Sequence, residues 1–482
     1  MMLASIVLLA AIGATFSPDN VFAVRTHASK CGIEATSGPA VPERADALFD
    51  WHADTLYSSG GANVVYDSRA RRFRFEGDGP VSQTGHYLSG QYGIRYRPRN
   101  RHVPFTTPPV GWMTWYAVKF KASDGVVMDN ARRFMEAFGD YVDERPVLWV
   151  DWEWYHEKMC SAGAEDHDLI TPRKAAYPRG MRAVSDDLRK LGFVPALWVS
   201  AICDVRTNAL WKAHPEWILG ERRNWSGGVW ADPTAPGFCE EFIPGLFRRY
   251  RDEWGYEAFK WDTVPNSLDL LGELQDRMYD PTVTPEDAFR RMVLAAREEL
   301  GPNVYLESCA AIKDRDLLSM IDLFDSGRIG DDIFGWTEFC RNGVDRLLRF
   351  FPLHSTAFWA DADNLVLRKE FSTEAQARTR VSVYGLLGVP VTVGDAMSEL
   401  DSLRIDMLRR IMPVVPVTPA SLDRGALNGD NLDLTVDFAR DFGSWQVKAW
   451  VNLSTNCERI VLFDAPGCVA WDYWNGAPSK AR

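Results

Sequence analysis

Residues 256–262 read YEAFKWD, a short apolar run that ends in charged side chains. Side chains alternate along a β-strand, so Lys260 and Asp262 face one side and Trp261 faces the other, where we expect it to pack against helices. Seven further runs combine a short apolar stretch with polar residues: GWMTWY (111–116), VLWVDWEW (147–154), VPALWVSA (194–201), NVYLESC (303–309), DLFDSGRIG (322–330), HSTAFWAD (354–361) and VPVTVGD (389–395). These eight runs are the expected strands of one sheet.

Helical segments separate several of these runs, at residues 124–138, 180–191, 285–300 and 373–386. Thr284 and Ser372 stand directly before the last two segments as candidate helix caps. Strands that alternate with helices are typical of a parallel sheet. Eight such repeats predict an α/β fold, a (β/α)8 TIM barrel over residues 109–413, with catalytic groups where strands end and loops begin.

The segments on either side of the barrel have a different pattern. Residues 24–108 carry short alternating stretches broken by glycine-rich turns, which predicts a small N-terminal β region. Alternation returns in LDLTVDF, WQVKAWVNL and RIVLFD, so we predict a C-terminal antiparallel β domain over residues 414–482. The chain stops soon after WDYWNG, where we would expect further strands, so truncation of this domain stays an alternative.

The first 23 residues contain an apolar stretch that is too short to span a bilayer and that ends in the small-residue signal VFA. We expect a signal peptide and a secreted or periplasmic protein. A buried N-terminal helix is the alternative, because no Lys or Arg precedes the apolar stretch. The eight cysteines are widely scattered and form no zinc motif, and Cys457 and Cys468 are the expected pair if disulfides form.

The composition also limits the possible partners. The chain has 482 residues and a formal net charge of −12, which argues against a nucleic-acid partner, and no later run is apolar enough to span a membrane. Its 19 Trp outnumber its 15 Tyr. Tryptophan is most useful where a flat apolar face meets polar groups, as in a sugar-binding cleft.

The residues at the ends of the expected strands are mostly acidic and aromatic. Such a set, without a metal cluster or a phosphate loop, indicates glycoside chemistry with two carboxyl groups across a sugar. Asp262 is the candidate nucleophile, because the positive charge of Lys260 on the same strand face keeps it ionised. A surface salt bridge is the alternative for this pair.

GRIGDDIFGW (327–336) supplies the second candidate carboxyl group. Two adjacent acids cannot both face inward, so one of Asp331 and Asp332 is the candidate general acid. We expect that acid to be protonated because an ionised nucleophile lies nearby. The alternative is an aspartate that caps the following helix, which would suit Asp331.

Nine pieces of this chain resemble, in order, the α-galactosidase-like clan of retaining glycoside hydrolases, clan D, families twenty-seven and thirty-six. They are GWMTWY, VDWEW, YPRGMRAVSDDLRKLGFVPALWV, WADPT, KWD, ESCAA, RIGDD, WADADNL and GVPVTVGD. The resemblance implies that Asp262 is the nucleophile and Asp332 the acid/base. It also implies that the sugar contacts Lys260, Arg328, Asp151, Trp115 and Cys309, and that no metal or cofactor is needed.

For several of these residues a structural role is the competing interpretation. Core packing competes for Trp115 and more strongly for Trp112. Cys309 is equally well explained as a buried thiol, and Glu307, a further candidate for substrate binding, as a partner in an internal ion pair. For Asp361 and Asp363 we expect a role in holding loops, so both stay outside the predicted site.

One departure from the clan pattern bears on specificity. The clan has two consecutive aspartates after the second strand, but here Trp152 follows Asp151. Glu153, on the same strand face as Asp151, is the candidate for the missing carboxylate. We therefore expect a retaining exo-α-glycosidase of the α-galactosidase type that acts on oligosaccharides or glycoconjugates. The alternatives are an α-N-acetylgalactosaminidase, a β-L-arabinopyranosidase and a non-catalytic carbohydrate-binding protein.

Overall fold

The computed structural model describes most of the barrel and parts of the two flanking β regions. The described residues are 6–9, 14–16, 21–26, 33–35, 45–50, 53–67, 69–70, 72–91, 105–155, 169–200, 203–204, 209–221, 229–309, 320, 322–351, 354, 358–415, 417, 419–424, 431–440, 443–458, 460–462 and 469–478.

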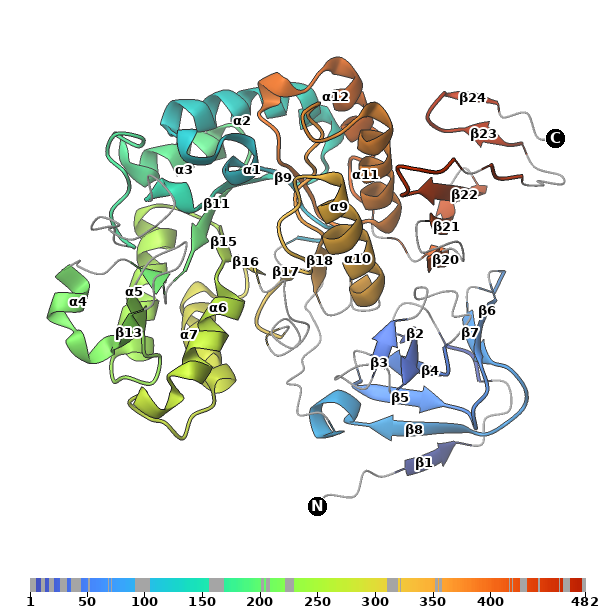
Figure 1. Ribbon diagram of the computed structural model, residues 1–482, viewed down its shortest axis with the longest axis horizontal. Coiled ribbons are helices and arrows are strands. Elements are labelled where there is room, and N and C mark those ends of the chain that lie inside the picture. Colours follow the sequence, from blue (N-terminus) through green and yellow to red (C-terminus); the bar gives the residue numbers. More distant parts are fainter. Residues whose placement is uncertain are drawn as a thin grey trace.

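Eight parallel strands form the central sheet, in the order β18-β17-β16-β15-β11-β10-β9-β19 (Figure 1). Leu365, just after β18, makes a parallel bridge to Val393 of β19 and brings the two ends of the sheet together. All eight predicted strands and the barrel fold are confirmed. Their bounds are β9 (Val110–Met113), β10 (Val147–Val150), β11 (Val194–Val199), β15 (Ala258–Trp261), β16 (Tyr305–Ser308), β17 (Ser326–Arg328), β18 (Trp359–Asp361) and β19 (Val391–Val393).

The strands bury side chains on both faces, because the barrel has an interior core and an outer layer of helices. Ala258 packs in the interior with Met113, Trp149 and Tyr305. Its neighbour on the strand, Phe259, belongs to the core beneath the helices, as does Trp261, whose ring stacks on Phe247 of α5 at a centroid distance of 5.2 Å. The predicted packing role of Trp261 is therefore confirmed.

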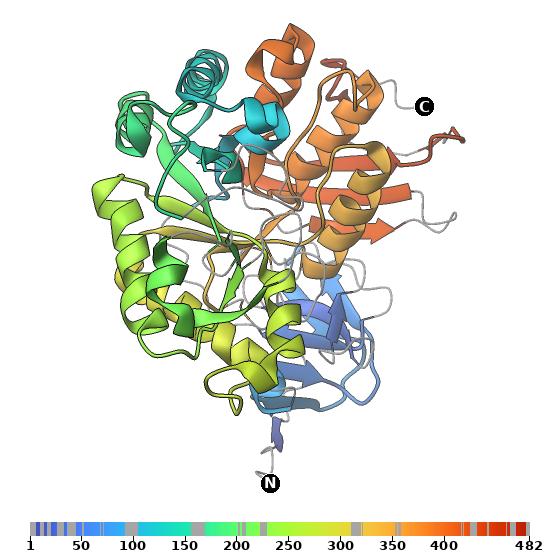
Figure 2. The same cartoon turned by 60° about the vertical axis from the view of Figure 1, so that its left-hand side comes forward.

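Helices cover the outside of the sheet in both views (Figures 1 and 2). They are α1 (Thr114–Val118), α2 (Asp124–Phe138), α3 (Gly180–Lys190), α4 (Ala209–Ala213), α5 (Ile243–Arg248), α6 (Val264–Glu273), α7 (Pro285–Leu300), α9 (Trp336–Glu338), α10 (Asp345–Phe350), α11 (Glu374–Leu387) and α12 (Ser402–Arg409). A small antiparallel sheet of β12 (Cys203–Asp204), β14 (Val229–Ala231) and β13 (Ile218–Glu221) interrupts the repeat between β11 and β15.

Two predicted caps have different outcomes. The Thr284 hydroxyl accepts a hydrogen bond from the Asp287 backbone N–H at the start of α7, so that cap is confirmed. The cap predicted at Ser372 is wrong. Thr373 caps α11 in a reciprocal box with Gln376, whereas the Ser372 hydroxyl donates to the Val366 carbonyl.

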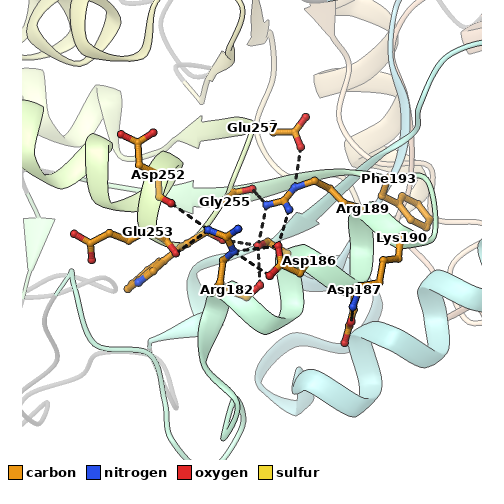
Figure 3. Close-up of polar contacts among 12 residues, drawn as sticks. Arg182, Asp186, Asp187, Arg189, Lys190, Phe193, Asp252, Glu253, Gly255 and Glu257 are labelled. Atoms are coloured by element: carbon orange, nitrogen blue, oxygen red, sulfur yellow. Dashed lines mark hydrogen bonds and ion pairs between the residues drawn. The ribbon is translucent and has the colours of Figure 1, made fainter.

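Ion pairs join α3 to the turn that leads into β15, the strand that carries Lys260 (Figure 3). Arg189 binds the Glu257 carboxylate at 3.1 Å and donates to the Gly255 carbonyl at 2.8 Å. Gly255 has a φ of +77°, and a Cβ atom at this position would lie 1.9 Å from the Arg189 guanidinium. The positive φ favours glycine here, and any larger residue would also displace the Arg189 guanidinium from the turn.

An antiparallel six-stranded sheet in the order β1-β8-β5-β4-β2-β3 and the hairpin of β6 and β7 make up the N-terminal region. The bounds are β1 (Ile6–Leu9), β2 (Val21–Thr26), β3 (Ile33–Ala35), β4 (Ala47–Asp50), β5 (Thr55–Ser58), β6 (Val64–Asp67), β7 (Arg72–Phe75) and β8 (Val81–Gly85). Strand β1 lies within the predicted signal peptide, which stays a prediction.

The C-terminal region contains the antiparallel strands β20 (Pro419–Arg424), β21 (Asn431–Arg440) and β22 (Gly443–Asn452) and the hairpin β23 (Trp471–Asp472) with β24 (Ala477–Pro478). This sheet and the N-terminal sheet lie on the same side of the barrel in both views (Figures 1 and 2). Cys457 is a free, exposed thiol, and Cys468, its predicted partner, lies outside the described residues. Within the described part of the chain, no helix has the length and apolarity needed to cross a membrane.

Candidate active site

Asp262 directly follows β15 and accepts two hydrogen bonds. The Trp198 indole N–H donates to Oδ2 at 2.9 Å, and the Thr263 backbone N–H donates to Oδ1 at 2.6 Å. Thr263, the N-cap residue of α6, has a φ of +64°, a strained conformation beside the carboxylate that it holds. These two donors fix the orientation of the carboxylate, which suits a nucleophile.

Lys260 pairs with Asp151 inside the mouth of the barrel. The Nζ–Oδ2 distance is 3.1 Å, and both side chains are at most 4% exposed. Burial lowers the pKa of Lys260, but the charges of Asp151, Cys309 and Asp262 outweigh it and raise the pKa well above the ordinary value. Burial raises the pKa of Asp151 despite Lys260. The alternative of a surface salt bridge at Lys260 is therefore excluded, because the lysine is a buried cation beside carboxylates.

Arg328, at the end of β17, binds two carboxylates at once. Its NH1 lies 3.0 Å from Asp363 Oδ1, and its NH2 lies 3.2 Å from Asp332 Oδ1. The Arg328 side chain is 2% exposed, whereas that of Asp332 is 47% exposed. Asp332 is thus the exposed partner of a buried guanidinium, and a ligand can reach it from the solvent.

The predicted protonation of Asp332 is wrong for the unliganded protein. Burial raises the pKa of this carboxyl, but Arg328 and Lys260 outweigh burial and hold the pKa below its ordinary value. The adjacent Asp331 is exposed and accepts a hydrogen bond from the Asp332 backbone N–H at 2.9 Å. Asp331 does not cap α9, whose N-cap residue is Gly335.

Two more carboxyl groups lie deeper in the barrel. Glu307 accepts a hydrogen bond from the Ser326 hydroxyl at 3.3 Å, and the charge of Asp361 acts on it. Burial, reinforced by the charge of Asp361, raises the pKa of Glu307 well above its ordinary value. Cys309, at the end of the same strand, is partly exposed, with Sγ 3.9 Å from Arg328 NH1. Burial and the Asp262 charge raise the pKa of this thiol.

Aromatic rings form one wall of the site. The Trp152 ring lies 5.7 Å from that of Trp115, 5.3 Å from Phe120 and 6.2 Å from Trp198. Trp115 is partly exposed and Trp152 is 2% exposed. Because Trp198 holds Asp262, Trp152 belongs to the wall that adjoins the candidate nucleophile. Trp112 is fully buried, and its indole donates to the Asp395 carbonyl, which favours packing.

Glu153 lies in a different environment from the other candidates. Burial raises its pKa well above the ordinary value, the charge of Asp151 adds to this shift, and Thr114 and Arg173 oppose it. Glu153 in turn raises the pKa of Tyr177, after burial itself. These neighbours place Glu153 toward residues 173–177, the segment that precedes α3.

The structure adds three side chains that the sequence did not predict for the site: Trp198, Tyr116 and Asp363. Trp198 pairs in register with the inward-facing Lys260, so strand alternation was the signal that could have placed it at the site. Asp363 lies two residues after the inward-facing Asp361, has a φ of +78° and binds both Arg328 and Tyr116. Among the described residues no group of three His, Cys, Asp or Glu could hold a metal ion.

The chain is similar to known proteins both in sequence and in structure. No protein-family model matches the chain. Its sequence is 20% identical over 297 residues to a probable α-galactosidase D of Aspergillus fumigatus, which covers 61% of this chain and 40% of that protein. The chain therefore spans less than half the length of this curated relative.

Two solved structures share the fold. A family 27 β-L-arabinopyranosidase from Geobacillus stearothermophilus aligns with a TM-score of 0.55 and 16% identity over 69% of this chain and 81% of that chain. An α-galactosidase from Thermus thermophilus aligns with a TM-score of 0.52 and 18% identity over 89% of this chain and 91% of that chain. Relatives found by sequence and by structure are thus α-galactosidase-like glycoside hydrolases, which confirms the resemblance to this clan.

Proposed function

We propose that the protein is a retaining exo-α-glycosidase of the α-galactosidase type. The observation that carries this proposal is the pair of Asp262 and Asp332 on different strand ends. Asp262 is held by two N–H donors and Asp332 by Arg328. Both carboxylates raise the pKa of the Cys309 thiol, after burial, so the charges of both act on the same side chain.

In this proposal Asp262 attacks the anomeric carbon while Asp332 protonates the departing glycosidic oxygen. A covalent glycosyl–Asp262 intermediate forms, and Asp332 then removes a proton from the water that hydrolyses it. The buried cations Lys260 and Arg328 stabilise the negative charge of the carboxylates, and Trp115 offers an apolar face to the sugar ring.

The variant Asp262→Ala tests the mechanism. We expect it to keep its far-UV circular dichroism spectrum and to lose turnover of aryl α-galactosides by more than about 10³-fold, because no other group can form the intermediate. A fluorosugar should label wild-type Asp262, as read by peptide mass spectrometry. Asp276→Ala, at an exposed acid in the short helix after α6, is the matched control and should keep full activity.

Retained activity of Asp262→Ala would exclude the proposed nucleophile. Sugar binding by the wild-type chain without turnover or a labelled adduct would instead support a carbohydrate-binding protein.

Trp152 favours a second candidate within the same mechanism. Its ring adjoins Trp115 and Trp198 where the clan pattern has a second aspartate, and an indole ring cannot accept hydroxyl hydrogen bonds as a carboxylate does. An α-N-acetylgalactosaminide or a β-L-arabinopyranoside is therefore the alternative substrate. Values of kcat/KM on a panel of aryl glycosides decide between these sugars and α-galactosides.

A further inference from the structure

Asp363, two residues after β18, is a buried carboxyl group that the proposed mechanism does not use. It is 1% exposed, and its φ of +78° lies in the left-handed region that residues other than glycine rarely adopt. Two contacts fix its backbone. Its N–H donates to Asp361 Oδ1 at 2.8 Å, and its carbonyl accepts a hydrogen bond from the Tyr384 hydroxyl at 3.1 Å. The surroundings thus hold Asp363 in a costly conformation, which is typical of residues at functional sites.

Each oxygen of the Asp363 carboxylate has two partners. Oδ2 accepts hydrogen bonds from the Tyr116 hydroxyl at 2.6 Å and from the Ile333 backbone N–H at 2.7 Å. Oδ1 accepts one from the Asn364 side-chain amide at 3.0 Å and pairs with Arg328 NH1 at 3.0 Å. A carboxylate offers about four lone-pair positions, and here all four face donors. These contacts suit an ionised carboxylate whose role is to hold its neighbours.

Two of the four partners belong to the segment that carries the candidate acid/base. Ile333 directly follows Asp332 in the chain, and Arg328 NH2 lies 3.2 Å from Asp332 Oδ1. The same NH2 group donates to the Gly330 carbonyl at 3.2 Å. The Asp332 side chain is 47% exposed, so these contacts orient it more than packing does. Asp363 therefore joins the loop after β18 to both ends of the segment 328–333.

We propose that Asp363 is a positioning residue for the acid/base: it holds Arg328 and the Ile333 backbone so that the Asp332 carboxyl group faces the glycosidic oxygen. This inference rests on the proposed glycosidase function. In this role Asp363 stays ionised and exchanges no proton with the substrate.

The charge of Asp363 also acts on the proton affinity of Asp332. Burial raises the pKa of Asp332, and Arg328 opposes burial most strongly. A negative charge on the other side of the guanidinium offsets part of that opposition, so an ionised Asp363 makes Asp332 easier to protonate, as acid catalysis requires. The effect is mutual, because the Asp332 charge raises the pKa of Asp363.

The ionisation of Asp363 agrees with this role at neutral pH. Burial, opposed by Arg328, raises the pKa of Asp363 to about 6, so the carboxylate form dominates above that pH. The other titratable groups that act on Asp332 or contact it are Lys260, Tyr116, Cys309 and Asp331.

The variant Asp363→Asn tests the positioning role. Asparagine keeps the size of the side chain and tolerates the positive φ, but its amide group donates where the partners need an acceptor. For a phenyl or alkyl glycoside, kcat/KM should fall by about 10²-fold, because the acid is displaced from the leaving oxygen. A dinitrophenyl glycoside of the same sugar needs no acid catalysis, so its kcat/KM should change less than about threefold. The alkaline limb of the pH profile should move to lower pH, since Arg328 then acts on Asp332 without the opposing charge.

Asp363→Gly is the second variant, because glycine adopts the positive φ without strain and so recovers part of any lost stability. It should show the same dependence on the leaving group. Asp325→Asn is the matched control, at the other end of β17. Its carboxylate pairs with Arg297 at 2.9 Å and accepts a hydrogen bond from the Leu306 backbone N–H at 2.9 Å. This variant should show neither the leaving-group dependence nor the shift of the alkaline limb.

Far-UV circular dichroism identifies the variants that fold. Equal losses on all leaving groups, no loss, or an unchanged alkaline limb in a folded Asp363 variant would overturn the positioning role alone. A wild-type chain inactive on every glycoside would overturn the proposed function and the positioning role with it.

Discussion

Lys260 and Asp151 show how much a single buried ion pair depends on both partners. Their charged atoms are 3.1 Å apart, and neither side chain exceeds 4% exposure. Removing one partner leaves the other charge buried without compensation, whereas removing both avoids that cost. The surface pair of Lys190 and Asp187 has the same kind of contact at 2.9 Å, but Lys190 is 73% exposed, so water screens it.

Lys260→Met should therefore lower the free energy of unfolding by about 3–5 kcal/mol at neutral pH, as measured by urea denaturation. Without the lysine, burial raises the pKa of Asp151 further. A carboxyl group whose pKa is higher in the folded state than in the unfolded chain lowers the free energy of unfolding as the pH rises above the unfolded pKa. At acidic pH the group is protonated in both states, so the loss should shrink there. The double variant Lys260→Met/Asp151→Asn should recover most of the loss, and Lys190→Met should cost less than about 1 kcal/mol. Equal losses for the two lysine variants would contradict this account.

At the scale of elements, helix α11 was predictable because its capping residues are local in the chain. The structure moves the cap by one residue, to Thr373, since the Ser372 hydroxyl is used by the Val366 carbonyl. The small sheet of β12, β13 and β14 was not predicted. Its strands are two to four residues long, too short for a periodic pattern, and β12 pairs with β14 rather than with the next strand in the sequence.

The cap of α11 bears on the site, because α11 carries Tyr384, which contacts the Asp363 carbonyl. Thr373→Ala should lower the free energy of unfolding by about 1 kcal/mol, since the Gln376 backbone N–H loses its partner. Thr379→Ala on the same helix is the control. Its hydroxyl donates to the Ala375 carbonyl within the helix, and alanine is the better helix former, so stability should stay equal or rise. Thermal denaturation followed by circular dichroism distinguishes the two results.

At the scale of the whole molecule, the strands could be predicted from the sequence, but only part of the site could. Lys260 and Asp262 share one strand, and Arg328 and Asp332 share one short motif, so their proximity is local. Tyr116 and Asp363 are 247 residues apart and meet only because the barrel closes. Strand alternation places a side chain inside the barrel but does not identify its partner from a distant strand, which is why this contact needed the structure.

Closure of the barrel also gathers buried carboxyl groups whose protons set the pH dependence of folding. Burial raises the pKa of Glu153, Glu307, Asp361 and Asp363, among others. Between the ordinary carboxyl pKa near 4 and these raised values, the folded protein binds more protons than the unfolded chain. Stability should therefore fall as pH rises across that window, by about 1.4 kcal/mol per pH unit for each extra proton bound.

Urea unfolding at several pH values between about 5 and 7.5 measures this slope, which is proportional to the difference in bound protons between the unfolded and the folded state. Glu153→Gln should reduce this slope by the equivalent of up to about one bound proton, because an amide does not titrate. Asp401→Asn is the control: a backbone hydrogen bond from Arg404 lowers the pKa of Asp401, so this group is ionised in both states across the window. Asparagine also keeps the cap of α12. A wild-type stability that rises with pH over this range would show that the buried carboxyl groups are ionised in the folded protein.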